Sequence, residues 1–151
     1  MYRIKNGNLE VFLVHPGGPL WKNNVKSVWS IPKGEVEIGE DFFVTAKREF
    51  EEETGMSINL DVPFISLGNV TQRSGKIVHA WAFEGDWPGI FLKQNIIEIE
   101  LPAGSGKKIQ IPEIDHAEFF KIEEAKKRIN MAQIEFIDRL QEILSNNSIK
   151  N

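Results

Sequence analysis

The chain has 151 residues, which suits one domain over residues 1–151, and its apolar content of 41% and charged content of 26% are ordinary for a globular protein. It has no cysteine, which excludes disulfides and thiolate metal sites, and its formal net charge of −4 argues against broad electrostatic binding to nucleic acid. No apolar run is as long as a membrane span, and the first residues do not resemble a signal peptide. We therefore expect no membrane partner and a cytoplasmic location.

The first part of the chain predicts a hairpin, a loop and a third short strand. Residues 2–5 and 9–15 are expected to pair around an Asn-Gly turn. The proline- and glycine-rich residues 15–19 predict a rigid loop. Residues 28–31 predict a strand that ends at residues 32–34, which contain a proline and a glycine.

A helix is expected from about residue 42 to residue 54. Asp41 suits its N-cap, because a short carboxylate can accept hydrogen bonds from the first free N–H groups of a helix. Gly55 suits the position just after the helix, where left-handed backbone is common. Its apolar side is expected to carry Phe43, Ala46 and Phe50.

Three glutamates of this helix form the most informative pattern in the chain. Glu49, Glu52 and Glu53 are spaced so that a helix brings them onto one face, where their charges repel. They also lie near the C-terminal end of the helix, where the helix dipole disfavours anions. A cation would relieve both penalties, and ligands that offer only oxygen favour Mg²⁺ or Mn²⁺. The pattern therefore predicts a divalent-metal site.

The rest of the chain predicts further strands and two C-terminal helices. Strands are expected at residues 64–71, 76–83, 96–101 and 118–120, with a loop at 102–108. Helices are expected near residues 123–128 and 132–144, followed by a frayed tail at 145–151. No internal repeat, linker or second domain is visible.

The segment from Gly34 to Met56 resembles the Nudix box. That motif is Gly, five residues, Glu, seven residues, then Arg-Glu-apolar-any-Glu-Glu-any-Gly-apolar. Its positions are all filled here, by Gly34, Glu40, Arg48, Glu49, Phe50, Glu52, Glu53, Gly55 and Met56. A chance match is on the order of one in a million or rarer for a chain of this length.

The resemblance implies an α/β fold, the Nudix α/β/α sandwich, with a mixed central β-sheet and the acidic helix carrying the catalytic residues. The predicted order of strands, one central acidic helix, more strands and a terminal helix is similar to that fold. Family members usually have more strand before the position of Tyr2. The chain is therefore expected to be either trimmed at its N-terminus or short there.

The resemblance also implies a Mg²⁺-dependent hydrolase of phosphoanhydride bonds, with Mn²⁺ as an alternative ion. The metal ligands carried over from the family are Gly34, through its backbone carbonyl, Glu49, Glu52 and Glu53. Arg48 matches an arginine that usually holds a neighbouring glutamate in place. Glu40 is expected to have a supporting role. Glu52, Glu49 and Arg48 are thus the expected catalytic residues of the box.

The general base and the substrate contacts are less closely defined by the motif. In the family the base is a box glutamate or an acidic residue on a distant loop or strand. The distant candidates here are Glu98, Glu100, Glu113 and Asp115, of which we favour Glu100. Lys33, just before the box glycine, His15 and Arg73 are candidate substrate contacts, and of these Lys33 is preferred to His15, for which a structural turn is the favoured role.

Several other residues invite a functional interpretation that we do not favour. His79 and His116 are expected to be structural, and at least one of Trp29 and Trp81 to lie in the core, although tryptophans could also stack on a base. Residues 104–108 lack Walker spacing and a following helix, so we reject them as a phosphate loop.

The box does not identify the substrate. Residues 68–73 lack the proline and the tyrosine typical of ADP-ribose and diadenosine polyphosphate hydrolases. We favour a pyrophosphohydrolase for nucleoside triphosphates or dinucleoside polyphosphates. One alternative is an enzyme for RNA 5′ ends, which predicts a basic strip formed by Arg73, Lys76, Lys107 and Lys108. The other is a non-catalytic nucleotide sensor. Homodimers are common in the family, but the sequence identifies no interface.

Overall fold

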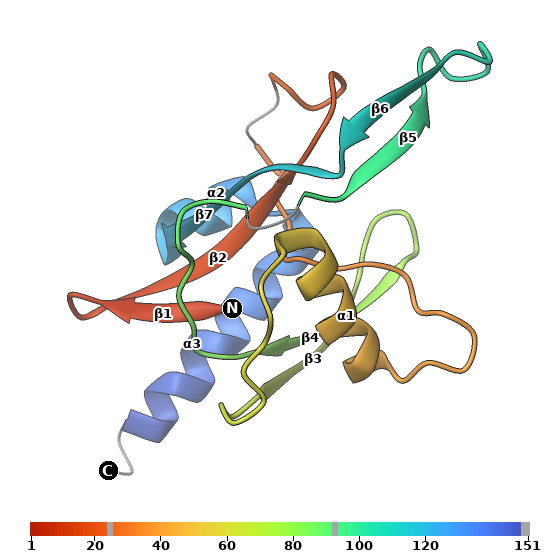
Figure 1. Cartoon of the computed structure of the whole chain (residues 1–151). Helices are drawn as coiled ribbons and strands as arrows, with labels where there is room; N and C mark the ends of the chain where they lie inside the picture. The colour runs from red at the N-terminus through yellow and green to blue at the C-terminus, as the bar shows by residue number, and fades with distance from the viewer. Residues whose placement is uncertain (24–25, 92–93, 149–151) are drawn as a thin grey trace.

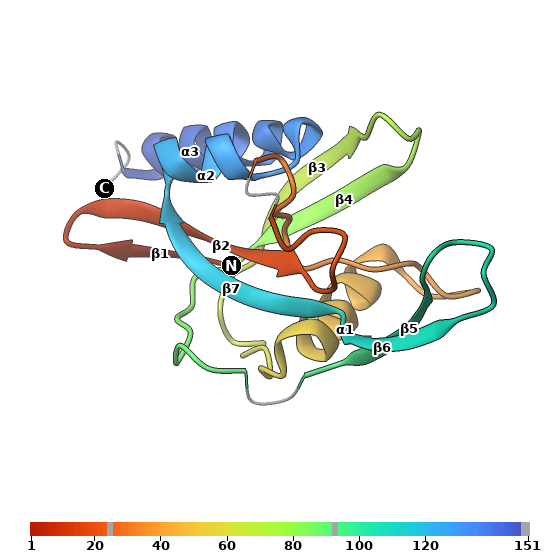
Figure 2. The same cartoon turned by 90° about the horizontal axis from the view of Figure 1, so that it is seen from above.

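Helices lie on both faces of a central layer of strands (Figure 1, Figure 2). The computed structural model describes residues 1–23, 26–91 and 94–148. Figure 2 shows α1 (Phe42–Thr54) on one side of the strands and α2 (Ile122–Arg128) with α3 (Ile134–Ser148) on the other. This arrangement is the α/β/α sandwich that the sequence predicts.

Strand β2 (Asn8–Pro16) is the centre of a three-stranded antiparallel sheet. It pairs with β1 (Tyr2–Lys5) on one side and with β7 (Ile114–Lys121) on the other. The turn between β1 and β2 has positive φ at Asn6 (51°) and Gly7 (74°), as two-residue hairpin turns require. The predicted N-terminal hairpin is therefore confirmed.

A second antiparallel pair, β3 (Ile65–Thr71) and β4 (Ile77–Ala82), joins this sheet beside β1. The backbone N–H of Tyr2 donates to the carbonyl of Phe83 (3.0 Å), and the N–H of Gly85 donates to the carbonyl of Tyr2 (2.9 Å). This connection is parallel, whereas the strand pairs are antiparallel. The central layer is therefore mixed, as predicted.

Alternation along β2 divides the core between the two faces of the sheet. Val11 and Leu13 belong to the buried cluster that includes residues of α3, whereas Phe12 and Val14 belong to a second cluster that includes Phe50 of α1. The division follows from strand geometry, because successive side chains point to opposite faces. Helix α1 is thus fixed to the sheet by its apolar side, which leaves its other sides available for a site.

Helix α1 begins and ends where the sequence predicts. The Oδ1 of Asp41 accepts hydrogen bonds from the N–H groups of Phe43 (2.8 Å) and Val44 (3.3 Å). Gly55 takes left-handed backbone (φ 72°) and donates its N–H to the carbonyl of Glu51 (2.8 Å). Both ends are therefore satisfied by the residues that the helix signals indicate.

The strand assignments between and after these elements needed correction. Residues 28–31 do not form a regular strand, since only Trp29 and Ser30 make isolated bridges, to Ile129 and Val14. The strand predicted at 118–120 is the end of the much longer β7. Sequence reading missed β6 (Lys108–Pro112), because its pattern is short and ends in proline, and its pairing with β5 (Ile96–Glu100) defines it instead.

The C-terminal helix also runs further than expected. A short 3₁₀ turn, η1 (Met131–Gln133), precedes α3, which continues to Ser148. Residues 145–148 of the predicted tail are therefore helical, and residues 149–151 lie outside the described part of the chain. The polar residues there have modest helix propensity, so continuation from the packed part of α3 has outweighed it.

The β5–β6 hairpin extends away from the layered body (Figure 1). It is a separate two-stranded sheet, and its β6 end leads directly into β7. Among the described residues, no helix has the length and apolar character needed to cross a membrane.

Candidate active site

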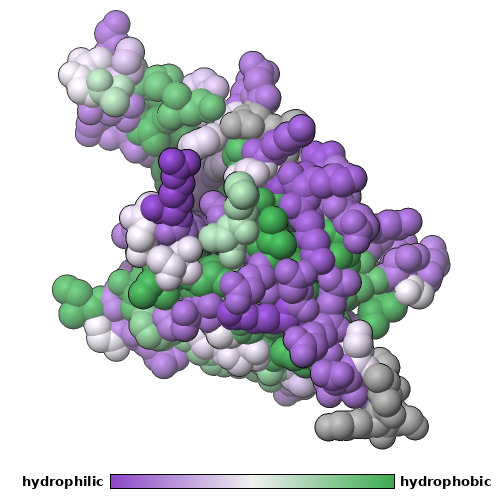
Figure 3. All heavy atoms as spheres, turned by 180° about the vertical axis from the view of Figure 1, so that it is seen from behind, coloured by the Kyte–Doolittle hydropathy of each residue, from purple (hydrophilic) through white to green (hydrophobic). Residues whose placement is uncertain are grey.

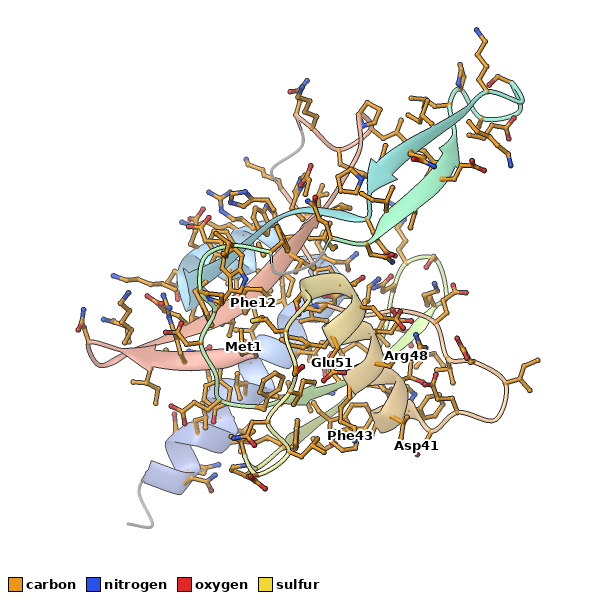
Figure 4. The ribbon with its side chains drawn as sticks, viewed as in Figure 1. Met1, Phe12, Asp41, Phe43, Arg48 and Glu51 are labelled. Carbon is orange, nitrogen blue, oxygen red and sulfur yellow. The ribbon has the colours of Figure 1, made fainter. Side chains whose placement is uncertain are left out.

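Arg48 joins the C-terminal half of α1 to the loop that precedes the helix. Its Nε and Nη2 donate to the two carboxylate oxygens of Glu40, both at 2.9 Å, and Nη2 also donates to the carbonyl of Glu35 (3.2 Å). Its Nη1 donates to Glu49 (2.9 Å) and to Glu52 (3.2 Å). Figure 4 shows Arg48 on α1 beside this loop. One guanidinium therefore positions two of the predicted metal ligands.

The same contacts explain the pKa of Glu40. The hydrogen bonds from Arg48, followed by one from the hydroxyl of Thr45 (2.7 Å), lower the pKa of Glu40 to about 2. Glu40 therefore remains ionised and holds Arg48 in return, whose own pKa is raised. The supporting role expected for Glu40 corresponds to this position.

Glu53 is a buried carboxylate with one backbone donor. Its side chain lies on the inner side of α1, the residue is only 6% exposed, and its Oε2 accepts a hydrogen bond from the N–H of Lys33 (2.9 Å). The pKa of Glu53 is raised to about 8, chiefly by burial and also by the charges of Glu113 and Glu49, against the opposing hydrogen bond and charge of Lys33. A positive charge placed beside such a carboxylate would stabilise its ionised form.

Gly34 lies directly against the carboxylate of Glu49. A Cβ at Gly34 would be 1.9 Å from the Cδ of Glu49, so no larger residue fits without displacing that side chain. Burial raises the pKa of Glu49, and Glu52 and Glu113 add to the rise, while Arg48 opposes it. The box glycine thus allows the backbone to approach an acidic side chain closely.

These residues suit a divalent cation by their chemistry. They offer carboxylate and carbonyl oxygens, and burial and mutual repulsion raise the pKa values of both Glu49 and Glu53. Among the residues that the structure describes, no three acidic or histidine side chains are arranged closely enough to hold an ion. Arg48 contacts Glu49 and Glu52, while Glu53 turns to the backbone of Lys33.

A cleft of about 700 Å³ reaches Gly34 and Glu53 of this group, whereas Arg48, Glu49 and Glu52 do not line it. It is bounded by the loop after β2, by the segment that leads into α1, by the side of α1 that faces β4, and by the β5–β6 hairpin. The predicted residues that line it are Lys33, Gly34, Glu53, Glu100 and Glu113. Gln72 and Lys76 also line it, and the amine of Lys76 pairs with Glu35 at 2.7 Å. A role for Gln72 is not evident from the sequence.

Two predicted substrate contacts do not line the cleft. His15 is buried, with its Nδ1 2.8 Å from the Oδ1 of Asp115 and its ring against Trp29 at 5.3 Å. Arg73 is exposed at the turn between β3 and β4, next to Gln72. Their positions lend no support to a substrate role, which stays a prediction. Trp29 is a core residue, as expected of at least one tryptophan.

The four acidic base candidates occupy different surroundings. Glu98 pairs with Lys108 (2.8 Å) on the hairpin, and Asp115 contacts His15. Glu100 lines the cleft, but its carboxylate accepts a hydrogen bond from the N–H of Gly106 in the hairpin turn. Glu113 also lines the cleft, and it alone of the four contributes to the raised pKa values of Glu49 and Glu53.

The glycine-rich loop after β2 has a structural function that sequence reading missed. The N–H of Gly17 donates to the carbonyl of Glu113 (2.9 Å), and a Cβ at Gly17 would be 1.9 Å from the carbonyl oxygen of Pro112. The loop therefore holds the backbone of Glu113 at the edge of the cleft. The pair of glycines was the available signal, since it marks a close approach between backbones.

Comparisons with known proteins agree with this arrangement. The sequence model of the NUDIX domain matches residues 1–140. RNA pyrophosphohydrolases from two strains of Caulobacter vibrioides are 40% identical over 55 residues, which are 33% of this chain and 32% of those proteins. The match thus spans about a third of the length of these curated relatives.

Two solved structures share the fold. One is a mutT/nudix family protein from Listeria innocua, with a TM-score of 0.60 and 19% identity over 99% of this chain and 92% of that one. The other is the NUDIX domain of Shewanella oneidensis NrtR complexed with ADP ribose, with a TM-score of 0.61 and 13% identity over 95% and 82%. The chain therefore belongs to the NUDIX domain family.

Proposed function

We propose that the chain is a Mg²⁺-dependent pyrophosphohydrolase that cleaves a nucleoside diphosphate linked to another group. Nucleoside triphosphates and dinucleoside polyphosphates are the substrates that we expect first. The observation that carries the proposal is a pair of carboxylates with raised pKa values: Glu49, half-buried against Gly34, and Glu53, buried at the wall of a cleft of about 700 Å³. Mn²⁺ is expected to replace Mg²⁺, because both ions prefer oxygen ligands.

The residues that would hold the ion are Gly34, Glu49, Glu52 and Glu53. When bound, the ion would neutralise phosphate oxygens and acidify a water molecule. Arg48 orients Glu49 and Glu52 through its Nη1, and the backbone of Lys33 orients Glu53. Among the described residues these side chains are not yet close enough together to share an ion, so binding of the ion would draw them away from these contacts.

Lys33 and Glu113 are the proposed partners for the substrate within the cleft. Lys33 lines the cleft, and its backbone N–H is held by the carboxylate of Glu53. Its ammonium group can contact a phosphate bound in the cleft. Glu113 replaces Glu100 as our preferred general base, because its charge acts on both Glu49 and Glu53, while the Nδ2 of Asn95 orients its carboxylate (2.8 Å). Geometry near the metal ligands is the first requirement of a base.

A second candidate is an RNA 5′-end pyrophosphohydrolase, and the Caulobacter relatives favour it. This candidate predicted a basic strip along the site. Of the four residues in that strip, only Lys76 lines the cleft, and Lys108 is paired with Glu98. These positions support a small nucleotide more than a long RNA.

Product analysis by chromatography tests the proposal. The protein is incubated with Mg²⁺, Mn²⁺ or EDTA and with nucleoside triphosphates, dinucleoside polyphosphates, ADP-ribose and a short triphosphorylated RNA. We expect selective cleavage of a nucleotide that EDTA abolishes and that Glu52→Gln and Glu53→Gln each reduce at least 100-fold.

Glu51→Gln is the matched control for these variants. It makes the same change on the same helix, where the exposed Glu51 accepts a hydrogen bond from the N–H of Ile58 (2.9 Å), which glutamine can also accept. It should cleave at the wild-type rate. Full activity in Glu52→Gln and Glu53→Gln would contradict the metal site, and preference for the triphosphorylated RNA would select the second candidate.

A further inference from the structure

The β5–β6 hairpin has one apolar face made of isoleucines. Its register pairs Ile97 with Ile111 and Ile99 with Ile109, so the four side chains share one face. The opposite face includes the ion pair between Glu98 and Lys108. A two-stranded hairpin alone is marginally stable in water, so an apolar face of this kind requires cover.

This apolar face is turned toward the cleft. Ile97, Ile99 and Ile111 line the cleft and are half-buried, although the hairpin stands away from the body. Figure 3 shows apolar surface on the projecting hairpin between its tip and the body. The loop after β2 covers part of this face at Ile111, and the rest of the face is open to whatever enters the cleft.

The other walls of the cleft also expose apolar and aromatic side chains. Trp21 is 42% exposed and Phe42 is 49% exposed, and both line the same space as the isoleucines. The ring of Phe42 stacks on His79, with ring centres 4.3 Å apart and an angle of 10° between the planes. Flat apolar surfaces from separate segments therefore surround one cavity that is about 700 Å³ in volume.

The hairpin is fixed at its base to the acidic end of the cleft. The N–H of Glu113 donates to the carbonyl of Asn95 (2.9 Å), and the Nδ2 of Asn95 donates to the carboxylate of Glu113 (2.8 Å). A Cβ at Gly18 would be 2.6 Å from the Cδ1 of Ile111, so the loop after β2 packs closely on the same wall. Ile111 and Glu113 are two residues apart, or roughly 7 Å along extended backbone.

We propose that the isoleucine face of the β5–β6 hairpin is the nucleobase-binding wall of the cleft. The proposal rests on the function proposed above and adds the part of the site that recognises the group beyond the phosphates. A flat heteroaromatic base covers Ile97, Ile99 and Ile111, while the phosphate chain extends past Glu113 toward Glu49 and Glu53. Because an apolar wall recognises ring area, it tolerates different bases.

The test compares two ligands that differ by the nucleoside. Isothermal titration with Mg²⁺ present measures binding of the α,β-methylene analogue of ATP, which is not cleaved at that bond, and of inorganic tripolyphosphate. In the double variant Ile97→Asn/Ile111→Asn we expect about a 10-fold or larger loss of affinity for the nucleotide analogue, the size typical of removing apolar contacts in a pocket. Tripolyphosphate affinity should stay unchanged.

Ile96→Asn is the matched control, because Ile96 lies on the opposite face of the hairpin, is 52% exposed and does not line the cleft. It should bind both ligands as the wild type does. Thermal melting checks that each variant is folded, and the milder Ile97→Ala replaces the double variant if that one is not.

Three results would overturn the proposal: unchanged nucleotide affinity in the folded hairpin variant, equal losses for both ligands, or no nucleotide binding by the wild type. The two proposals fail separately. If the hairpin variant loses the nucleotide selectively but no nucleotide is ever cleaved, the pyrophosphohydrolase fails and the wall stands. If cleavage depends on Glu52 but not on the hairpin, the wall fails and the enzyme stands.

Discussion

Arg48 and Glu40 form a two-pronged ion pair in which Nε and Nη2 each lie 2.9 Å from one carboxylate oxygen. Glu40 lies in the loop between Gly34 and Asp41, and Arg48 lies eight residues later on α1. The ion pair therefore holds this loop against the helix. Since the remaining nitrogen of Arg48 contacts Glu49 and Glu52, the position of the loop and the positions of two acidic side chains depend on one guanidinium.

Replacing this arginine by lysine is the first prediction. Lysine keeps the charge but cannot donate in parallel to Glu40 while also contacting Glu49 and Glu52. We expect Arg48→Lys to lose about 10- to 100-fold in activity or metal affinity, the range typical of residues that orient metal ligands. Steady-state rates at several Mg²⁺ concentrations measure both quantities.

Lys47→Ala is the control for that variant. Lys47 is the neighbouring cation on α1, and its amine lies over the ring of Phe43, 4.7 Å from the ring centre and away from the acidic cluster. It should keep wild-type rates and wild-type Mg²⁺ dependence. If Arg48→Lys behaves in the same way, the guanidinium does not position the glutamates.

Gly34→Ala tests the close approach of backbone to carboxylate. The added Cβ would overlap the carboxylate of Glu49, at 1.9 Å from its Cδ, so that side chain must move. We expect activity to fall at least 10-fold while the protein remains folded, because a small displacement of a reacting group is costly. Turnover under saturating Mg²⁺, together with thermal melting, measures the effect.

Gly104→Ala gives the contrasting result. Gly104 has φ of +77° in the hairpin turn, and a Cβ there meets no atom within 4 Å. The change should lower stability by about 1–2 kcal/mol, the cost of left-handed backbone at alanine, and leave turnover unchanged. Equal turnover in both alanine variants would contradict a catalytic role for the close approach of Gly34 to Glu49.

The acidic helix could be predicted in detail because its signals are local. Asp41 caps it, Gly55 ends it, and the spacing of Glu49, Glu52 and Glu53 is visible within a few residues. In the helix the residues that decide the structure are therefore close neighbours in the sequence. The mixed sheet is implied only by the resemblance, because its parallel connection joins Tyr2 to Glu84.

The other side of the site could not be predicted because it depends on distant contacts. The alternation in β5 indicates one polar face, which favoured Glu100, but it cannot tell which face turns to the cleft. That choice depends on the pairing of β5 with β6 and on the contact of Gly17 with Glu113, almost a hundred residues away. The contact between His15 and Asp115 likewise joins residues 100 positions apart.

Gln133 connects the C-terminal region to the segment that carries Lys33 and Gly34. It is fully buried, and its Oε1 accepts hydrogen bonds from the N–H of Ile31 (3.0 Å) and from the hydroxyl of Ser30 (3.3 Å). Gln133→Leu leaves the partly buried N–H of Ile31 without this acceptor. We expect the free energy of unfolding to fall by about 1–3 kcal/mol, the usual cost of such a group, measured by urea denaturation.

The same substitution at Gln141 is the comparison for Gln133. Gln141 lies on α3 and accepts a hydrogen bond from the amine of Lys126 (3.1 Å), which water can replace at this partly exposed position. Gln141→Leu should change the unfolding free energy by less than about 0.5 kcal/mol, as is usual for surface positions. A similar small value for Gln133→Leu would contradict the structural role of Gln133.

The buried Glu53 makes a prediction about stability and pH in the absence of metal. Its pKa is about 8 in the folded chain and near the ordinary value of 4.5 in the unfolded chain. Between these values the folded state binds a proton that the unfolded state has lost, so the free energy of unfolding falls as pH rises from about 4.5 to about 8. The contribution amounts to roughly 3–5 kcal/mol, since one pKa unit corresponds to about 1.4 kcal/mol.

Urea denaturation in EDTA across this pH range measures the effect, with Glu53→Gln for comparison. Glutamine can still accept the hydrogen bond from the N–H of Lys33 but has no proton to lose, so the variant should lack this part of the pH dependence and become more stable than the wild type toward pH 8. Added Mg²⁺ should restore stability to the wild type at high pH, because a metal binds the deprotonated carboxylate. Parallel pH profiles for the two proteins in EDTA would mean that Glu53 does not hold its proton in the folded chain. Burial would then not disfavour the ionised carboxylate of Glu53, and a bound cation would have no such cost to offset at this position.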